Sequence, residues 1–106
     1  MLSLVKELCL LNGVSSGEDE VRAFIREKAA PYAEAMRTDA LGNLIVFKKG
    51  AKATGNKLML TAHMDEVGFI VNDITEDGYL KFAPVGGIDP RVVIGKRVSV
   101  GLGRGQ

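Results

Sequence analysis

The 106-residue sequence contains few of the residues that form cross-links and metal sites: one cysteine, one histidine and no tryptophan. A single cysteine excludes an intramolecular disulfide and is typical of a protein from a reducing compartment. Cys9 lies among leucines, so we interpret it as a small hydrophobic residue rather than a reactive thiol. A single histidine likewise excludes a metal site built from several imidazoles of this chain alone.

The sequence also lacks an excess of charge and a long apolar run. Fourteen Lys and Arg against thirteen Asp and Glu leave a formal net charge of +1, which favours neither nucleic acid nor an anionic membrane as a partner. No apolar run approaches the roughly 20 residues of a membrane-spanning helix. Lys6 and Glu7 interrupt the early apolar stretch that a secretory signal needs. We therefore expect a cytoplasmic protein.

The first 30 residues have helical periodicity. Apolar residues within positions 4–11 fall on one helical face. Ser15 and Ser16 are candidate N-caps of a second helix, and Glu18 stands at the capping-box spacing from Ser15. Pro31 lacks a backbone N–H, so we expect the second helix to end there.

Short strands are predicted next. Residues 36–38 and 44–47 favour a hairpin through the turn Gly42-Asn43. Residues 58–62 form an apolar run typical of a strand covered on both faces of an α/β sheet. Ligands collect at the carboxyl ends of strands in open α/β sheets, and His63 stands at that end.

The second half of the chain has glycine-rich turns and a strand-like pattern. Residues 69–71 and 79–82 flank Asp77-Gly78, a strong hairpin signal, and residues 92–94 and 97–100 are two further predicted strands. Such a series is typical of a small barrel or sandwich.

The predicted fold class is therefore α/β. Residues 1–66 form the opening part of an α/β domain, and residues 67–106 form the opening strands of a small all-β domain. Two helices and a few short strands are too few to cover a sheet on both faces. Small domains also bury proportionally little surface, so neither part has a complete core. We therefore expect the chain to be a fragment of a longer protein.

His63 and Asp65 are the candidate site residues. A catalytic zinc takes about three protein ligands and leaves one position open, and a metal-bound imidazole usually donates its other N–H to an acceptor. Residues two apart in a strand face the same side, so Asp65 could orient His63, or bind the metal directly if the chain bends after Met64. A single histidine near a strand end is more often a structural or surface residue, and spacing alone leaves these alternatives open.

The stretch Ala62–Phe69 resembles the metal-binding strand of the M42 family of metallo-aminopeptidases. That family includes glutamyl and tetrahedral aminopeptidases and relatives sometimes labelled endoglucanase. Three further blocks resemble the family in the expected order, and they are residues 11–18, 38–44 and 86–91. The resemblance extends over about residues 1–100.

The resemblance implies a role for each part. Residues 1–66 would be the amino-terminal part of the catalytic α/β domain, and residues 67–106 the first part of an inserted, barrel-like β domain that mediates dimerisation. His63 would be one terminal ligand of a site for two divalent ions, zinc or cobalt. Asp65 would be the catalytic-site carboxylate that orients the imidazole, and Glu66 a structural or pocket-rim residue. No position matches the other ligands or the general-base glutamate.

The implied activity is removal of amino-terminal residues from peptides by metal-activated water, in a protein that forms homo-oligomers. The 106 residues alone are expected to be inactive. The alternative hypothesis is a non-catalytic assembly or interaction module with a vestigial metal site. A related carboxypeptidase or deacetylase is disfavoured by the flanking blocks, and a polysaccharide hydrolase by the absence of an identifiable pair of carboxyls across a cleft.

Overall fold

The computed structural model describes residues 1–52 and 55–101, which form helices and two small sheets in two compact units. The first unit comprises residues 1–11 and 19–64, and the second comprises residues 12–18 and the chain from Asp65 onward. Each sheet has two strands. Within the described part of the chain, no helix has the length and apolar character needed to cross a membrane.

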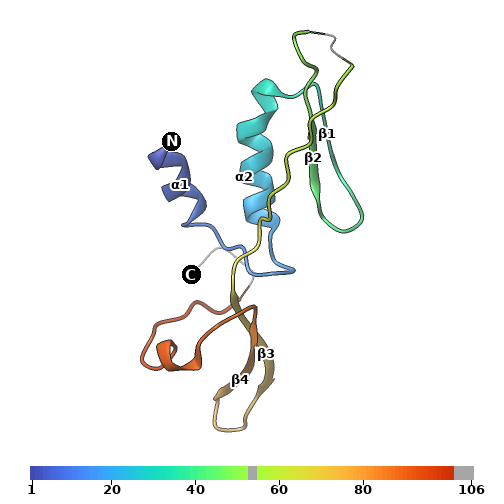
Figure 1. The fold of residues 1–106 in the computed structure, drawn as a ribbon. Helices are drawn as coiled ribbons and strands as arrows, with labels where there is room; N and C mark the ends of the chain where they lie inside the picture. Colours follow the sequence, from blue (N-terminus) through green and yellow to red (C-terminus); the bar gives the residue numbers. More distant parts are fainter. Residues whose placement is uncertain (53–54, 102–106) are drawn as a thin grey trace. The chain divides into compact units, whose positions relative to one another are not determined.

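The helices of the first unit are α1 (Leu2–Leu8) and α2 (Asp19–Ala29), and α2 continues into a 3-10 helix, η1 (Ala30–Tyr32) (Figure 1). Acidic residues occupy the first turn of α2 and basic residues its last turn, which matches the helix dipole. The predicted end of the second helix near Pro31 is confirmed, because the α-helical bonding stops two residues earlier.

The predicted N-cap is wrong. Helix α2 begins at Asp19, too far along the chain for Ser15 or Ser16 to cap it. The Ser15 hydroxyl instead donates a hydrogen bond to Asp65, and Glu18 Oε1 accepts the backbone N–H of Ser16 at 2.8 Å. The capping-box spacing is present in the sequence, but these side chains hold a loop.

Strands β1 (Ala35–Thr38) and β2 (Leu44–Phe47) form an antiparallel hairpin, which confirms the prediction. Asp39 builds the connecting turn. Its Oδ1 accepts the N–H groups of Leu41 at 3.0 Å and of Asn43 at 2.9 Å, and its Oδ2 accepts Asn43 Nδ2 at 2.9 Å. Such bonding by an Asp side chain mimics a backbone turn.

Two arginines of α2 fix this hairpin to the helix. Arg22 Nε donates to the carbonyl oxygen of Gly42 at 2.7 Å, and Arg26 Nη2 donates to Thr38 Oγ1 at 2.7 Å. Gly42 has a φ of 85°, and a Cβ there would lie 2.8 Å from Arg22 Nη2. The positive φ favours glycine in this turn, and the absence of a side chain leaves room for the end of the arginine.

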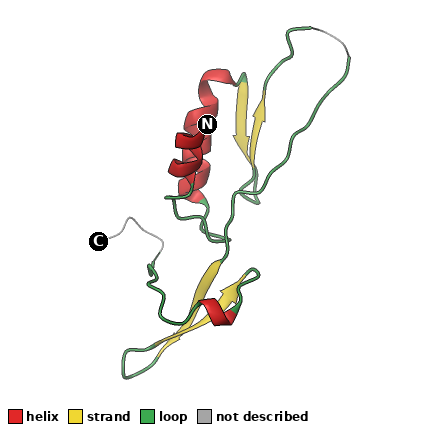
Figure 2. Cartoon of the chain, turned by 60° about the vertical axis from the view of Figure 1, so that its left-hand side comes forward, coloured by secondary structure: helices red, strands yellow, loops and turns green. Residues whose placement is uncertain are grey.

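In the second unit, β3 (Gly68–Ile74) and β4 (Leu80–Val85) form another antiparallel hairpin (Figure 2). The pairing is irregular between Val71 and Asp73. The predicted turn is confirmed, since the chain reverses around Gly78, which has a φ of 84°. The rings of Phe69 and Phe82 meet edge to face across the two strands, with their centroids 4.7 Å apart.

The predicted strand at residues 58–62 is wrong. The segment pairs with no strand among the described residues, and the side chains of Leu58, Met59 and Leu60 are 82–87% exposed. A strand covered on both faces requires partner strands at its edges and helices above and below. The described residues give this segment neither.

The predicted strands at residues 92–94 and 97–100 are also wrong. A 3-10 helix, η2 (Pro90–Val92), includes the first residue of the predicted strand 92–94. Asp89 caps this helix by accepting the N–H of Arg91 at 3.0 Å. The chain then turns at Gly95, which has a φ of 75°. The described part of this unit therefore contains a single hairpin, and the predicted barrel or sandwich is not confirmed.

The Asp39 turn predicts a pH dependence for the β1–β2 hairpin. Hydrogen bonds from the Asn43 side chain and backbone lower the pKa of Asp39 below its ordinary value of 3.8. A lowered pKa stabilises the turn above the ordinary pKa, and this stabilisation is lost as the pH falls through the lowered value. The Asn43 amide signal in NMR spectra should therefore move toward its position in an unstructured peptide as the pH falls through the lowered pKa of Asp39. The variant Asp39→Asn should remove that pH dependence, and the control Glu76→Gln should keep it. An Asn43 signal that does not move with pH in the unchanged protein would contradict the role of the Asp39 carboxylate in the turn.

Candidate functional site

The two residues predicted to form the site differ in their surroundings. His63 is exposed and lies at the end of the extended segment in the first unit. Asp65 is half-buried and begins the long segment of the second unit. The contact of the carboxylate that defines its direction lies within the second unit.

A loop of residues 12–18 holds Asp65 from a distant part of the sequence. Ser15 Oγ donates a hydrogen bond to Asp65 Oδ2 over 2.5 Å. This length is typical of a charge-assisted bond between a hydroxyl and a carboxylate. The bond fixes one oxygen of Asp65 in a defined direction, although the two residues are fifty positions apart in the chain.

Glu66 binds the same loop through its backbone and its side chain. Its N–H donates to the carbonyl oxygen of Gly13 at 2.7 Å, and its Oε1 accepts the N–H of Gly13 at 3.2 Å. Gly13 is buried, so an unpaired backbone group there would be costly. Val14 and Glu66 also form a parallel β-bridge. Glu66 is thus a structural residue of the loop contact, as the resemblance implied.

Gly68 lets the loop approach this segment closely. A Cβ at Gly68 would lie 2.8 Å from Val14 Cγ1, a distance that real Cβ atoms do not tolerate. The loop itself turns through a bond from the N–H of Gly17 to the carbonyl oxygen of Val14 at 2.7 Å, with Ser16 at a φ of 74°. The valine therefore fills the space that a larger residue at position 68 would need.

Sequence reasoning proposed His63 and Asp65 as site residues but missed the contacts of Ser15 with Asp65 and of Gly13 with Glu66. The spacing of Ser15 and Glu18 gave a sufficient local explanation for the serine, namely a helix cap. A hydrogen bond across fifty residues leaves no periodic signal in one sequence. The sole indication was that residues 11–18 and the block around His63 both resemble the same family.

The described residues do not supply a complete metal site. Among residues 1–52 and 55–101, no group of three His, Cys, Asp or Glu side chains is placed to hold an ion. His63 has suitable ligand chemistry, but Asp65 Oδ2 and Glu66 Oε1 both accept hydrogen bonds from the loop. A pair of divalent ions needs more donors than this arrangement offers.

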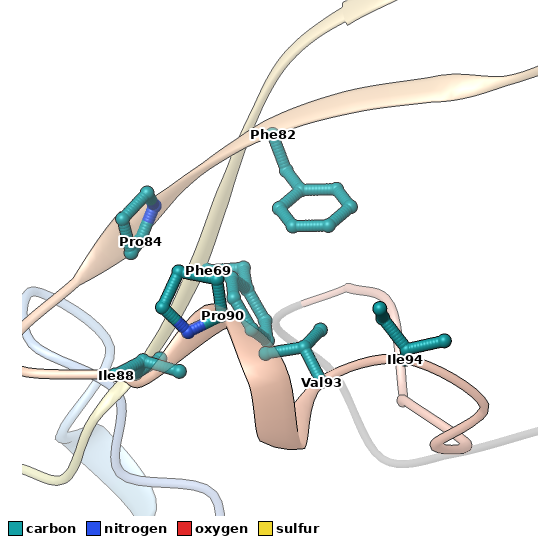
Figure 3. Close-up of a pocket in the computed structure, with 7 residues that line it drawn as sticks. All are labelled: Phe69, Phe82, Pro84, Ile88, Pro90, Val93 and Ile94. Atoms are coloured by element: carbon teal, nitrogen blue, oxygen red, sulfur yellow. The ribbon is translucent and has the colours of Figure 1, made fainter.

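An apolar recess lies in the second unit, on one side of the β3–β4 hairpin. Its volume is about 420 Å³ (Figure 3). Figure 3 shows apolar side chains facing it from the hairpin, from η2 and from the segments around η2; they are Phe69, Phe82, Pro84, Ile88, Pro90, Val93 and Ile94. The side chains that line it carry no acid, base or nucleophile, so the recess can bind apolar groups but has no catalytic group of its own.

The sequence model of the M42 glutamyl aminopeptidase family matches residues 42–106. The chain belongs to this family. It is 42% identical over 99 residues to a putative aminopeptidase of Acetivibrio thermocellus, and the match covers 93% of this chain and 29% of that protein. Membership confirms the resemblance found in the sequence.

Solved structures agree with this assignment. The chain is similar to an endoglucanase from Thermotoga maritima, with a TM-score of 0.75 and 49% identity over 82% of this chain and 28% of that one. It is also similar to a TET aminopeptidase from a marine sediment archaeon, Thaumarchaeota archaeon SCGC AB-539-E09, with a TM-score of 0.76 and 37% identity over 86% and 25% of the two chains. The chain thus spans between a quarter and a third of the length of these similar proteins.

The contact between Gly68 and Val14 predicts the effect of a single methyl group. Gly68→Ala should separate the loop from Glu66 and raise the amide exchange rate of Glu66 by about tenfold, the equivalent of ~1.4 kcal/mol. Hydrogen exchange followed by NMR measures this. Because no atom lies within 4 Å of the corresponding position at Gly87, Gly87→Ala is the matched control. Combining Gly68→Ala with Val14→Ala should restore slow exchange, and equal rates in the two glycine variants would show that the close approach is unimportant.

Proposed function

We propose that this chain is the amino-terminal portion of a metallo-aminopeptidase that removes amino-terminal residues from peptides. Membership of the M42 glutamyl aminopeptidase family carries the proposal. The similarity to an aminopeptidase over 93% of the chain supports it, since the matched region includes the block around His63. One similar structure is named as an endoglucanase, but the family model and the similar protein from Acetivibrio thermocellus both favour the aminopeptidase.

Within this proposal, His63 is a ligand to one of two divalent ions, zinc or cobalt, and Asp65 orients its imidazole. Bound ions would activate a water molecule and polarise the scissile carbonyl. The remaining ligands and the general-base glutamate would come from polypeptide beyond these 106 residues. The contribution of this chain is therefore an exposed imidazole and a carboxylate held by the loop of residues 12–18.

The proposal also assigns each of two regions of the chain to a domain. Residues 1–66 belong to the catalytic α/β domain, and residues 67–106 are the first part of an inserted β domain through which the protein forms homo-oligomers in the cytoplasm. The exposed apolar side chains of β3 and β4 and the recess beside them support an interface role for this region, because exposed edges of a sheet and apolar patches favour association.

The isolated chain and a chimera test this function. The purified chain should not hydrolyse aminoacyl-anilides after addition of zinc or cobalt, because its described residues lack a complete ligand set. Replacing the matching portion of the Acetivibrio thermocellus protein with this chain should produce an aminopeptidase. In that chimera, His63→Ala should lower kcat/KM by more than about 100-fold and Asp65→Asn by about 10–100-fold.

A matched control in the chimera is Glu76→Gln, which changes an exposed charge in the β3–β4 turn and should leave kcat/KM unchanged. Hydrolysis by the isolated chain would refute the claim that the active site is incomplete. A well-folded but inactive chimera that still assembles into oligomers would favour the alternative, a non-catalytic assembly module.

A further inference from the structure

Two segments fifty residues apart meet at three hydrogen bonds in the second unit. Gly13 exchanges two bonds with Glu66, one through the backbone N–H of Glu66 and one through its carboxylate. Ser15 donates the third, to Asp65 Oδ2. The first two bonds fix the backbone at Gly13, and the parallel β-bridge between Val14 and Glu66 continues this contact toward Ser15.

The conformation of the loop is costly, which indicates that its shape is determined by its contacts. Ser16 has a φ of 74°, in the left-handed region that disfavours residues with a Cβ. Such a conformation persists only where the surroundings impose it. Here the bond from Gly17 to Val14 closes the turn, and Glu18 accepts the N–H of Ser16.

The absence of a side chain at Gly68 adds a steric constraint. Val14 occupies the space in which a Cβ of Gly68 would stand, so the loop cannot slide along the segment without losing this contact. The hydrogen bonds of Gly13, the turn at Ser16 and the packing of Val14 therefore all set the same register. In that register the Ser15 hydroxyl reaches Asp65.

We infer that Ser15 is a positioning residue for Asp65, and that the loop of residues 12–18 sets the direction of that carboxylate. The inference rests on the proposed function, in which Asp65 orients the imidazole of His63. Ser15 acts only through Asp65, and its hydroxyl holds Oδ2 while the loop prevents the carboxylate from rotating. A residue with a hydroxyl is required at position 15, whereas a helix cap would accept several other residue types.

NMR spectroscopy of the full 106-residue chain tests this inference. Ser15→Ala should shift the carboxyl carbon resonance of Asp65, and Ser15→Thr, which keeps the hydroxyl, should restore it. Ser3→Ala, in the exposed helix α1, is the matched control and should leave the resonance unchanged. The inference would be overturned if the Asp65 resonance were unchanged in Ser15→Ala or not restored in Ser15→Thr. It would also be overturned if the Glu66 amide exchanged as in an unstructured peptide.

Kinetics of the chimera separate this inference from the proposed function. Ser15→Ala should lower kcat about tenfold with little change in KM, because a misdirected carboxylate affects a residue of the active centre rather than peptide binding. Ser15→Thr should recover most of the rate. A chimera without any activity would refute the proposed function, but the Asp65 resonance would still decide whether Ser15 positions the carboxylate. Full activity of Ser15→Ala would overturn the inference and leave the proposed function intact.

Discussion

The small number of buried apolar side chains is the constraint on which the rest of this structure depends. Among the described residues, Val21 is the one buried hydrophobic side chain, at 7% exposure, whereas Leu58 and Leu60 are more than 80% exposed. Removal of apolar surface from water is the main favourable contribution to folding, at about 25 cal/mol per Å². With so little of it, the described elements rely on hydrogen bonds between strands, within turns and from side chains to the backbone, together with a few close contacts. Individual polar residues therefore carry an unusually large share of the local structure.

The loop contact of Asp65 follows from this constraint. In a buried active site, packing on all sides restricts the rotation of a carboxylate. Here the Ser15 hydroxyl holds the Asp65 carboxylate by a directed bond, and the bonds between Gly13 and Glu66 place the loop that carries Ser15. Such bonds need an accurate register, and Gly68 provides it by admitting Val14. The geometry around the carboxylate thus depends on a few contacts within one unit rather than on a core.

Elements specified by local chemistry were predictable from the sequence. The turns at Gly42-Asn43 and Asp77-Gly78 indicated both hairpins, because they contain residues that suit turns. Residues 58–62 were predicted wrongly because a buried strand is defined by its neighbours, and hydrophobicity alone cannot supply them. The role of Ser15 was missed because its partner lies fifty residues away. His63 was recognised through family resemblance, and the contacts that hold Asp65 came from the structure alone.

The two candidate residues stand in different surroundings. The carboxylate of Asp65 accepts a hydrogen bond from the loop of residues 12–18, and His63 follows an apolar segment whose side chains face solvent. A ligand is held in a productive geometry only when the element that carries it is itself fixed by packing. In the proposed enzyme, strands and helices from further polypeptide would cover residues 58–62 and fix the imidazole as well as completing the ligand set. Covering this segment and forming the metal centre would then be one event in the proposed enzyme.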